Sequence, residues 1–390
     1  MSGPGRAESF RFYSAAFVAD WAFYLVFTSI PLKAISLGGG PLVLGLLPAL
    51  SSTVYILCAL SFGRLSDRGG RMRMARTGAL AIAVGAILLQ RATRIPQLFL
   101  FLPLIGIGGG LFWPAIQAEL GDRGGVVGLG RRMGWFNVSW SAGKMMGFWT
   151  AGHIAQAHGT SAPLLLAVLF EIIVFFLVPR DEERGAPPAA QPSESLTPLD
   201  DRGRSFRRAA WLANLVAFGV GATLNYQFPK RLFSIGLREG DLGNFLGFIG
   251  LVQTLTFAWL GLRRGWEDRA SSIALPMLIG AASVGGLALA GREGSILLCA
   301  PGIGLALGFA YSASLFHSLH QDEQRGKNTG IHEALLGSGS FLLPLAGGAL
   351  ARTTGLTAPY ILCAGACAFS AGIALLWLRR RGRDWPASSS

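Results

Sequence analysis

The chain alternates long uncharged runs with short charged segments, and this alternation restricts its fold more than any other feature. A helix needs about 20 consecutive apolar residues to cross the hydrocarbon core of a bilayer. Twelve stretches meet this requirement and lack the strict alternation of a barrel strand. We therefore predict an all-α polytopic membrane protein with twelve transmembrane helices, at about residues 12–33, 41–63, 74–90, 95–118, 132–154, 160–179, 208–230, 242–262, 270–291, 294–317, 329–351 and 356–378.

The composition excludes a soluble two-domain protein, because 51% of the 390 residues are hydrophobic and only 14% are charged. The net charge of +13 is unevenly distributed. With the N-terminus in the cytoplasm, 25 of the 34 Lys and Arg residues lie at cytoplasmic ends or loops. This asymmetry predicts that both termini are cytoplasmic, in a plasma or inner membrane. No basic segment is long enough to form a nucleic-acid-binding domain, so we expect no nucleic-acid partner.

The sequence contains no pattern typical of an enzyme, a cofactor site or a metal site. There is no phosphate-binding loop of the Walker type and no plausible triad of Ser, His and Asp. The four cysteines lie in apolar stretches without the spacing of a metal site or a disulfide framework: Cys58, Cys299, Cys363 and Cys367. We therefore expect neither catalysis, nor a cofactor, nor a bound metal.

Residues 63–76, with the sequence GRLSDRGGRMRMAR, form a basic segment between the uncharged runs 34–62 and 77–90. Arg and Asp are costly inside hydrocarbon, so this segment is predicted to be a tight turn at the membrane surface. Its spacing resembles the signature loop between the second and third helices of major facilitator superfamily transporters. The matching residues are Gly63, Asp67, Arg68, Gly70, Arg71 and Arg73.

The resemblance implies the fold and mechanism of that superfamily. Two six-helix halves would enclose a site near the middle of the membrane and rock around it, which alternates access to the two sides. The loop would act as a conformational gate, with Asp67 near the start of the eleventh helix at residues 328–330. The resemblance further implies a monomeric secondary transporter whose partners are the lipid bilayer, a small-molecule substrate and protons.

Two further patterns divide the chain into halves. Residues 180–207 change abruptly to a Pro, Ser, Glu and Arg composition that cannot build a core, which predicts a cytoplasmic linker between halves 1–179 and 208–390. The halves also repeat one another. An offset of 198 aligns Pro31, Lys33, Ser36, Gly38 and Gly45 with Pro229, Arg231, Ser234, Gly236 and Gly243, and an offset of 196 aligns Gly106, Gly108, Gly134, Gly143 and Gly152 with Gly302, Gly304, Gly330, Gly339 and Gly348.

The fifth span carries a second family-like pattern. Its glycines Gly134, Gly143, Gly147 and Gly152 resemble the fifth-helix pattern of antiporters in the superfamily. Phe148 stands where that pattern has proline, so the match is incomplete. The resemblance implies an efflux antiporter.

Polar side chains inside apolar spans are the candidate site residues, because each must face water, a partner or a proton pathway. Neighbours on a helix face different ways, so one or two of residues 225–227 are expected to line a cavity. The candidates for the substrate or proton pathway are Asp20, Asn137, Lys144, Asn225, Tyr226, Gln227, His332 and Glu333.

Structural explanations stay open for several of these residues. Asp20 could pair with an arginine, and Lys144 could pair with a buried carboxylate. His332 and Glu333 could instead cap the cytoplasmic end of their helix. His317, at the end of the tenth span, is expected at the surface.

Three of the candidates predict how transport is driven. Lys144 is the single cation expected at the depth of Asp20 and Glu333, and one lysine cannot neutralise two carboxylates. One carboxyl group is therefore protonated during part of the cycle. We predict proton coupling, with His332 and Glu333 as the titrating pair and Asp20 with Lys144 as an ion pair. The alternative is a transporter-like sensor or scaffold without transport activity.

Overall fold

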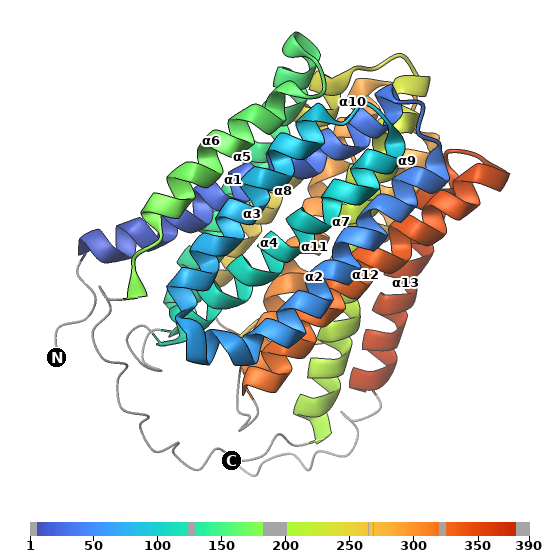
Figure 1. Cartoon of the computed structure of the whole chain (residues 1–390). Helices are drawn as coiled ribbons and strands as arrows, with labels where there is room; N and C mark the ends of the chain where they lie inside the picture. The colour runs from blue at the N-terminus through green and yellow to red at the C-terminus, as the bar shows by residue number, and fades with distance from the viewer. Residues whose placement is uncertain are drawn as a thin grey trace.

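A computed structural model of the chain describes residues 6–122, 129–181, 201–263, 265–267, 269–319 and 325–379. All regular elements within these ranges are helices, which form one bundle (Figure 1). The first half contains α1 (Arg6–Ser36), α2 (Pro41–Gly69), α3 (Arg71–Arg91), α4 (Ile95–Asp122), α5 (Leu129–His158) and α6 (Ala162–Leu177). The second half contains α7 (Asp201–Ser234), α8 (Glu239–Leu262), α9 (Ser271–Leu289), α10 (Glu293–Leu297), α11 (Ala300–Leu319), α12 (Arg325–Thr354) and α13 (Ala358–Arg379). Apart from α10, a short helix of 5 residues, twelve long helices remain, six in each half. The predicted all-α fold with twelve long helices in two halves is therefore confirmed.

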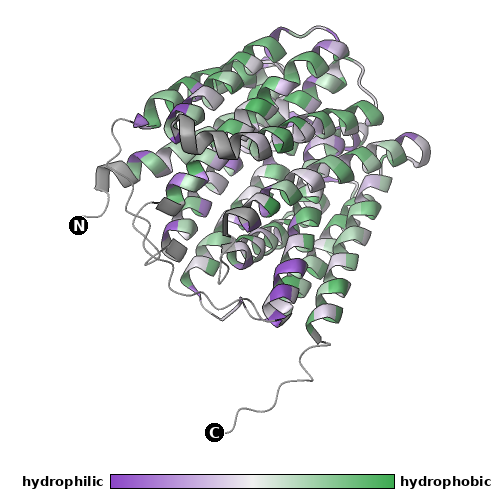
Figure 2. Cartoon of the chain, turned by 60° about the horizontal axis from the view of Figure 1, so that its bottom comes forward, coloured by the Kyte–Doolittle hydropathy of each residue, from purple (hydrophilic) through white to green (hydrophobic). Residues whose placement is uncertain are grey.

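The bundle is built for a membrane. Hydrophobic residues run along most of the helix lengths, and hydrophilic residues gather toward the helix ends (Figure 2). In the described part of the chain, 9 spans are long and apolar enough to cross a bilayer. Of the other long helices, α5 and α7 carry more polar residues, and α6 has 16 residues. The chain is therefore a multi-pass integral membrane protein.

Both ends of the described chain lie at one end of the bundle, where α1 begins and α13 ends (Figure 1). We call this the termini end. The opposite end, which we call the far end, contains short connections such as residues 37–40, 92–94, 159–161, 235–238 and 355–357. The bundle thus has two distinct ends that the central helices connect.

The structure changes several predicted boundaries. Helix α7 begins at Asp201 and not near residue 208, so it includes the last part of the predicted linker. Residues 182–200 of that linker lie outside the described residues. The predicted tenth span is divided into α10 and α11. The linker prediction was made from composition, and a charged first turn of a helix has the same composition as a linker.

The basic segment 63–76 is helix rather than a surface loop. Helix α2 continues to Gly69, α3 begins at Arg71, and Gly70 alone joins them. Gly70 has φ 87°, a left-handed conformation that favours glycine, and a Cβ there would overlap the carboxylate of Asp181. That carboxylate accepts hydrogen bonds from the backbone N–H groups of Met72 at 3.0 Å and Arg73 at 2.9 Å. Because Asp181 caps α3 in this way, a single residue is enough to reverse the chain.

The predicted repeat appears in the packing of the first four helices of each half. Lys33 donates a hydrogen bond to the carbonyl of Gln90, and at an offset of 198 Arg231 donates to the carbonyl of Ala288 at 3.0 Å. The glycines after these helices, Gly38 and Gly236, have φ of 84° and 83°.

The structure corrects one offset. Gly106 approaches Ser51 and Val54, whereas Gly304, rather than Gly302, approaches the equivalent Ile249 and Val252. The offset for α4 and α11 is therefore 198. The offset of 196 holds for α5 and α12, since Gly143 meets the carbonyl of Phe17 and Gly339 that of Leu215.

Two helix pairs join the halves: α2 packs on α12, and α5 packs on α8. Glycines allow these backbones to approach closely. A Cβ at Gly45 would meet the carbonyl oxygen of Pro344, and one at Gly152 would meet that of Glu239. The two interfaces flank the space between the halves, where the candidate site lies.

Candidate functional site

A cavity of about 170 Å³ lies between the two halves. Helices α1, α2, α4 and α5 form one side of it, and α7, α8, α11 and α12 form the other. Its ionisable wall residues are Asp20, Lys144 and Glu333. Many of the remaining wall residues are aromatic, namely Phe23, Tyr24, Phe27, Tyr55, Trp113, Phe136, Trp140, Phe148, Phe218, Tyr226 and Tyr311. Such a wall suits an organic molecule that carries apolar surface and a small number of polar groups.

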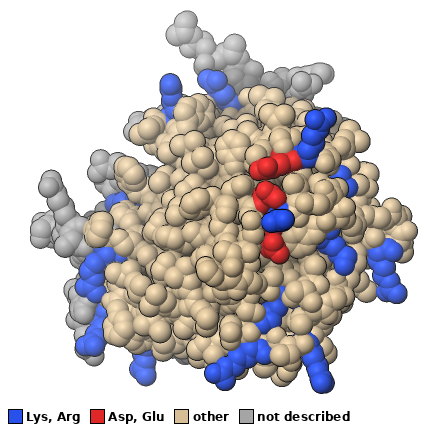
Figure 3. All heavy atoms as spheres, turned by 90° about the horizontal axis from the view of Figure 1, so that it is seen from above, with Lys and Arg blue, Asp and Glu red and all other residues tan. Residues whose placement is uncertain are grey.

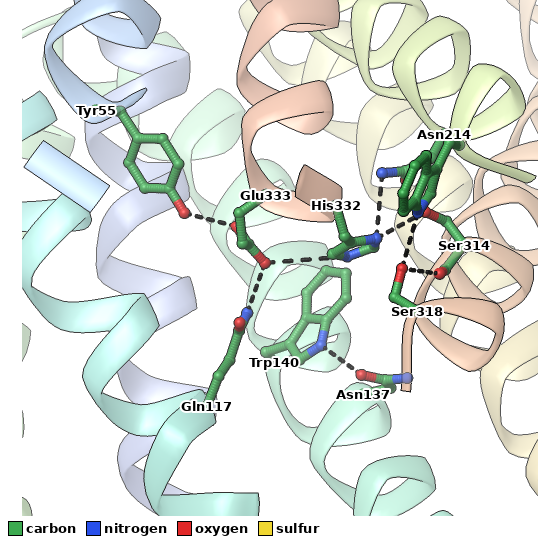
Figure 4. A network of polar contacts seen from close by, with 10 residues as sticks. Tyr55, Gln117, Asn137, Trp140, Asn214, Ser314, Ser318, His332 and Glu333 are labelled. Carbon is green, nitrogen blue, oxygen red and sulfur yellow. Dashed lines mark hydrogen bonds and ion pairs between the residues drawn. The ribbon is translucent and has the colours of Figure 1, made fainter. Parts of the chain in front are cut away.

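Glu333 on α12 connects the two halves at the cavity wall (Figure 4). The hydroxyl of Tyr55 on α2 donates a hydrogen bond of 2.8 Å to Oε2 of Glu333. The side-chain amide of Gln117 on α4 donates one of 2.9 Å to Oε1. Both donors belong to the first half and the acceptor to the second, so this carboxyl group joins the halves.

His332 lies behind Glu333 and is fully buried. Its Nδ1 is 2.7 Å from Oγ of Ser314 on α11 and 3.5 Å from Nδ2 of Asn214 on α7. An amide nitrogen can only donate, which suits a neutral imidazole with its proton on Nε2. Nε2 faces Oε1 of Glu333 at 3.9 Å (Figure 4). The ring therefore stands between the carboxyl group and a polar chain inside the second half.

That polar chain continues toward the termini end. Oγ of Ser318 donates to the carbonyl of Ser314 at 2.7 Å, and Nε1 of Trp211 donates to Oγ of Ser318 at 2.8 Å. Sequence reasoning missed these residues, as well as Tyr55 and Gln117. Tyr and Ser are common in transmembrane spans, and only their convergence on one carboxyl and imidazole pair distinguishes them.

Lys144 on α5 is buried in a pocket built by both halves. Its Nζ donates a hydrogen bond of 3.1 Å to the side-chain oxygen of Gln253 on α8. The rings of Tyr24, Phe148 and Phe218 lie at 5.2, 5.8 and 5.9 Å from Nζ, so each ring face can attract the ammonium group. An amide and three rings thus hold this charge at the cavity wall.

Asp20 on α1 lines the same cavity as Lys144. Among the described residues, the ammonium group of Lys144 donates to the side-chain oxygen of Gln253, and the predicted direct ion pair with Asp20 is not formed. Oδ2 of Asp20 is buried without a hydrogen-bond partner among the described residues. Asp20 therefore presents an unused acceptor close to a lysine.

Of the other predicted residues, some line the cavity and others lie behind its wall and hold the helices together. Asn225 and Tyr226 line the cavity, as expected for two of three consecutive residues. Gln227 faces away and donates to the carbonyls of Pro41 at 3.1 Å and Pro344 at 3.2 Å, which ties α7 to α2 and α12. Asn137, Gln227 and His332 thus lie behind the wall, where Asn137 accepts a hydrogen bond of 3.1 Å from Nε1 of Trp140.

Two predictions outside the cavity fare differently. The side chains of Gly63, Asp67 and Arg68 lie outside the described residues, so the contact of Asp67 with residues 328–330 stays a prediction. The surface position predicted for His317 is wrong. Its ring is buried and stacks on Phe206 with the ring centroids 5.5 Å apart.

Comparison with known proteins places the chain among transporters. The sequence profile described as Major Facilitator Superfamily matches residues 12–314 and 295–389. The multidrug resistance protein MdtG of Proteus mirabilis is 28% identical over 134 residues. That match covers 32% of this chain and 33% of MdtG, so the chain spans about a third of the length of this relative.

Solved transporter structures share the fold over almost the whole chain. A bacterial homologue of the human lysosomal transporter Spinster, in an inward-facing and occupied conformation, gives a TM-score of 0.74 with 12% identity and covers 100% of both chains. The nucleoside transporter NupG gives 0.71 with 12% identity, over 97% of this chain and 100% of its own. The human organic anion transporter MFSD10 gives 0.66 with 16% identity, over 96% and 100%. At these identities the likeness concerns the fold alone.

Proposed function

The chain belongs to the major facilitator superfamily, and from this premise we propose that it is a proton-coupled secondary transporter of small organic solutes. The observation that carries the proposal is the position of Glu333. This carboxyl group lies on the cavity wall, accepts two hydrogen bonds from the first half, and faces a buried histidine of its own half. A change of its protonation state therefore acts on the contact between the halves.

The chemistry of the two donors supports coupling. A carboxylate accepts the hydrogen bonds of Tyr55 and Gln117 together. A proton on Glu333 replaces the ionised acceptor with a neutral carboxyl group, so both hydrogen bonds lose the strength that a charged acceptor gives them. Protonation thus weakens the link between α12 and the first half, and deprotonation restores it. This is the two-state element that alternating access requires.

The cavity supports an amphipathic organic cation as the substrate. Lys144 offsets the charge of Asp20, which leaves the charge of Glu333 without a cation of its own at the wall. The aromatic rings around it can hold apolar groups and attract positive charge. A cation and a proton would then compete for one carboxyl group, which leads to antiport and, with an inward proton gradient, to efflux. The partial similarity to a protein named for multidrug resistance agrees with this class.

We further propose that the termini end faces the cytoplasm of a plasma or inner membrane, because it carries the larger share of Lys and Arg. The far end also has Lys and Arg around its rim, but its acidic side chains gather in one area (Figure 3). A reporter that is active only in the cytoplasm should be active when it is fused to the C-terminus, and a reporter that is active only outside the cytoplasm should be inactive there. One chain supplies both walls of the cavity, so we expect the monomer to be active.

The test uses purified protein in proteoliposomes with ethidium as the probe cation and an imposed pH gradient. Wild type should move ethidium against its gradient, and Glu333→Gln should lose the response to the pH gradient and bind ethidium more weakly, because its side chain carries no charge. Glu293→Gln, at the far end, is the matched control and should behave as wild type. Transport that ignores the gradient in wild type would overturn proton coupling. Binding of ethidium without any transport would favour a sensor.

A further inference from the structure

A second groove lies outside the transport cavity, between α8, α9 and α11 near the termini end. Its volume is about 670 Å³. Helices α8 and α9 are joined here by residues 263–270, whereas Gly70 alone joins the equivalent helices α2 and α3. The second half therefore has a longer connection between these helices at the termini end.

The walls of this groove face the bilayer. Leu255 is 58% exposed, Leu275 is 56% exposed and Trp259 is 49% exposed, and all three belong to transmembrane helices. Trp259 and Trp266 pack near the ring of Phe309, with centroids 6.0 and 6.5 Å away. An apolar groove closed by tryptophans at the polar edge of a membrane has the shape and chemistry to hold an acyl chain.

The mouth of the groove carries positive charge. Arg263 follows the end of α8, and Arg269 precedes the start of α9. Both are exposed, and neither forms a hydrogen bond or an ion pair through its guanidinium with another described residue. The hydroxyl groups of Ser271 and Ser272 lie at the same edge. The carboxylate of Glu267, in the same connection, accepts a hydrogen bond of 2.6 Å from the backbone N–H of Gly265. Two exposed arginines next to two hydroxyl donors form a site for a phosphate group that carries net negative charge.

We propose that this groove binds an anionic phospholipid. Arg263 and Arg269 hold the phosphate, Ser271 and Ser272 donate to its oxygens, and one acyl chain lies along Leu255 and Leu275. A zwitterionic lipid brings its own cation to the same place and gains less from the two arginines. This site requires only that the chain is embedded in a membrane, so it stands independently of proton coupling and of the substrate.

The experiment is native mass spectrometry of the purified protein with equal amounts of phosphatidylglycerol and phosphatidylcholine. Wild type should retain phosphatidylglycerol preferentially, and the preference should fall about fivefold for each arginine replaced in Arg263→Gln and Arg269→Gln. The conservative pair Arg263→Lys and Arg269→Lys should keep most of it. The control pair Arg91→Gln and Arg94→Gln removes the same charge from exposed positions at the far end and should leave the preference unchanged.

Two results would overturn the proposal. One is equal retention of both lipids by wild type. The other is an equal loss of preference in the control pair, which would mean that overall charge and not this groove selects the lipid. Competition by inorganic phosphate alone would assign the arginines to a free anion and would also contradict the lipid site.

Discussion

The two helix pairs that join the halves have the same backbone packing but opposite chemistry. Tyr55 on α2 and Gln253 on α8 are equivalent at the offset of 198, since Gly110 approaches the carbonyl of Tyr55 and Gly308 that of Gln253. Tyr55 donates to a carboxyl group, Glu333, whereas Gln253 accepts from an ammonium group, Lys144. The equivalent positions thus bind a carboxyl group in the α2 and α12 interface and an ammonium group in the α5 and α8 interface.

This difference distinguishes the residues that set the helix packing from the residues that line the cavity. The glycines that set the helix distances recur in both halves, so they record the duplication. The ionisable residues do not recur: Asn137 stands at the position equivalent to Glu333, and Ser340 at the position equivalent to Lys144. Two identical interfaces would respond identically to a proton. Because they differ, the proposed protonation of Glu333 would act on the α2 and α12 interface and would leave the charge at the α5 and α8 interface unchanged.

The largest expected effect comes from removal of the base. Lys144→Met removes the lysine at the cavity wall that Asp20 lines, and it leaves the side-chain oxygen of Gln253 without its buried donor. Transport of ethidium in proteoliposomes should fall by more than about tenfold, and the melting temperature should drop. The double variant Asp20→Asn with Lys144→Met should regain the melting temperature, because no uncompensated charge is left. Wild-type transport by Lys144→Met would contradict the role of the base.

A smaller effect tests the shared scaffold. Gly143→Ala and Gly339→Ala each place a methyl group against a backbone carbonyl, that of Phe17 and that of Leu215. Each should cost about 1–3 kcal/mol of stability, seen as similar decreases in melting temperature. Gly372→Ala is the control, since its Cβ would meet nothing within 4 Å. A decrease in only one of the two variants would show that the contact of α5 with α1 and the contact of α12 with α7, each within one half, are not equivalent in packing.

The smallest expected effect concerns the segment that differs most between the halves. Asp67→Asn removes the charge predicted to meet the start of α12, and such helix-dipole contacts are worth up to about 1 kcal/mol. Ethidium transport should fall by about two- to fivefold with normal expression. Glu267→Gln, in the connection between α8 and α9, should have no effect on transport. Unchanged turnover in Asp67→Asn would remove the gate from this segment.

The sequence predicted the scaffold well and the site in part. Hydropathy identifies transmembrane helices because backbone groups in hydrocarbon must bond within a helix, so the positions of the spans are determined locally. The gating segment was predicted as a loop because its charges suggest one. In the structure, the start of α3 within this segment is capped by Asp181, which lies far along the chain. Residues 182–200, directly after it, were recognised as polar from composition alone.

The sequence by itself determined that this chain spans a membrane many times, that its halves repeat, and that Asp20, Lys144 and Glu333 lie at membrane depth, because each of these follows from hydropathy or from residue spacing. Only the tertiary structure decided which groups meet. Tyr55 and Gln117 reach Glu333 across 278 and 216 positions of the chain, and Lys144 donates a hydrogen bond to Gln253, which was not predicted. The partners of Glu333 and Lys144 depend on the rotation of each helix about its axis and on how closely glycines let two backbones approach. That geometry is a property of the packed halves together.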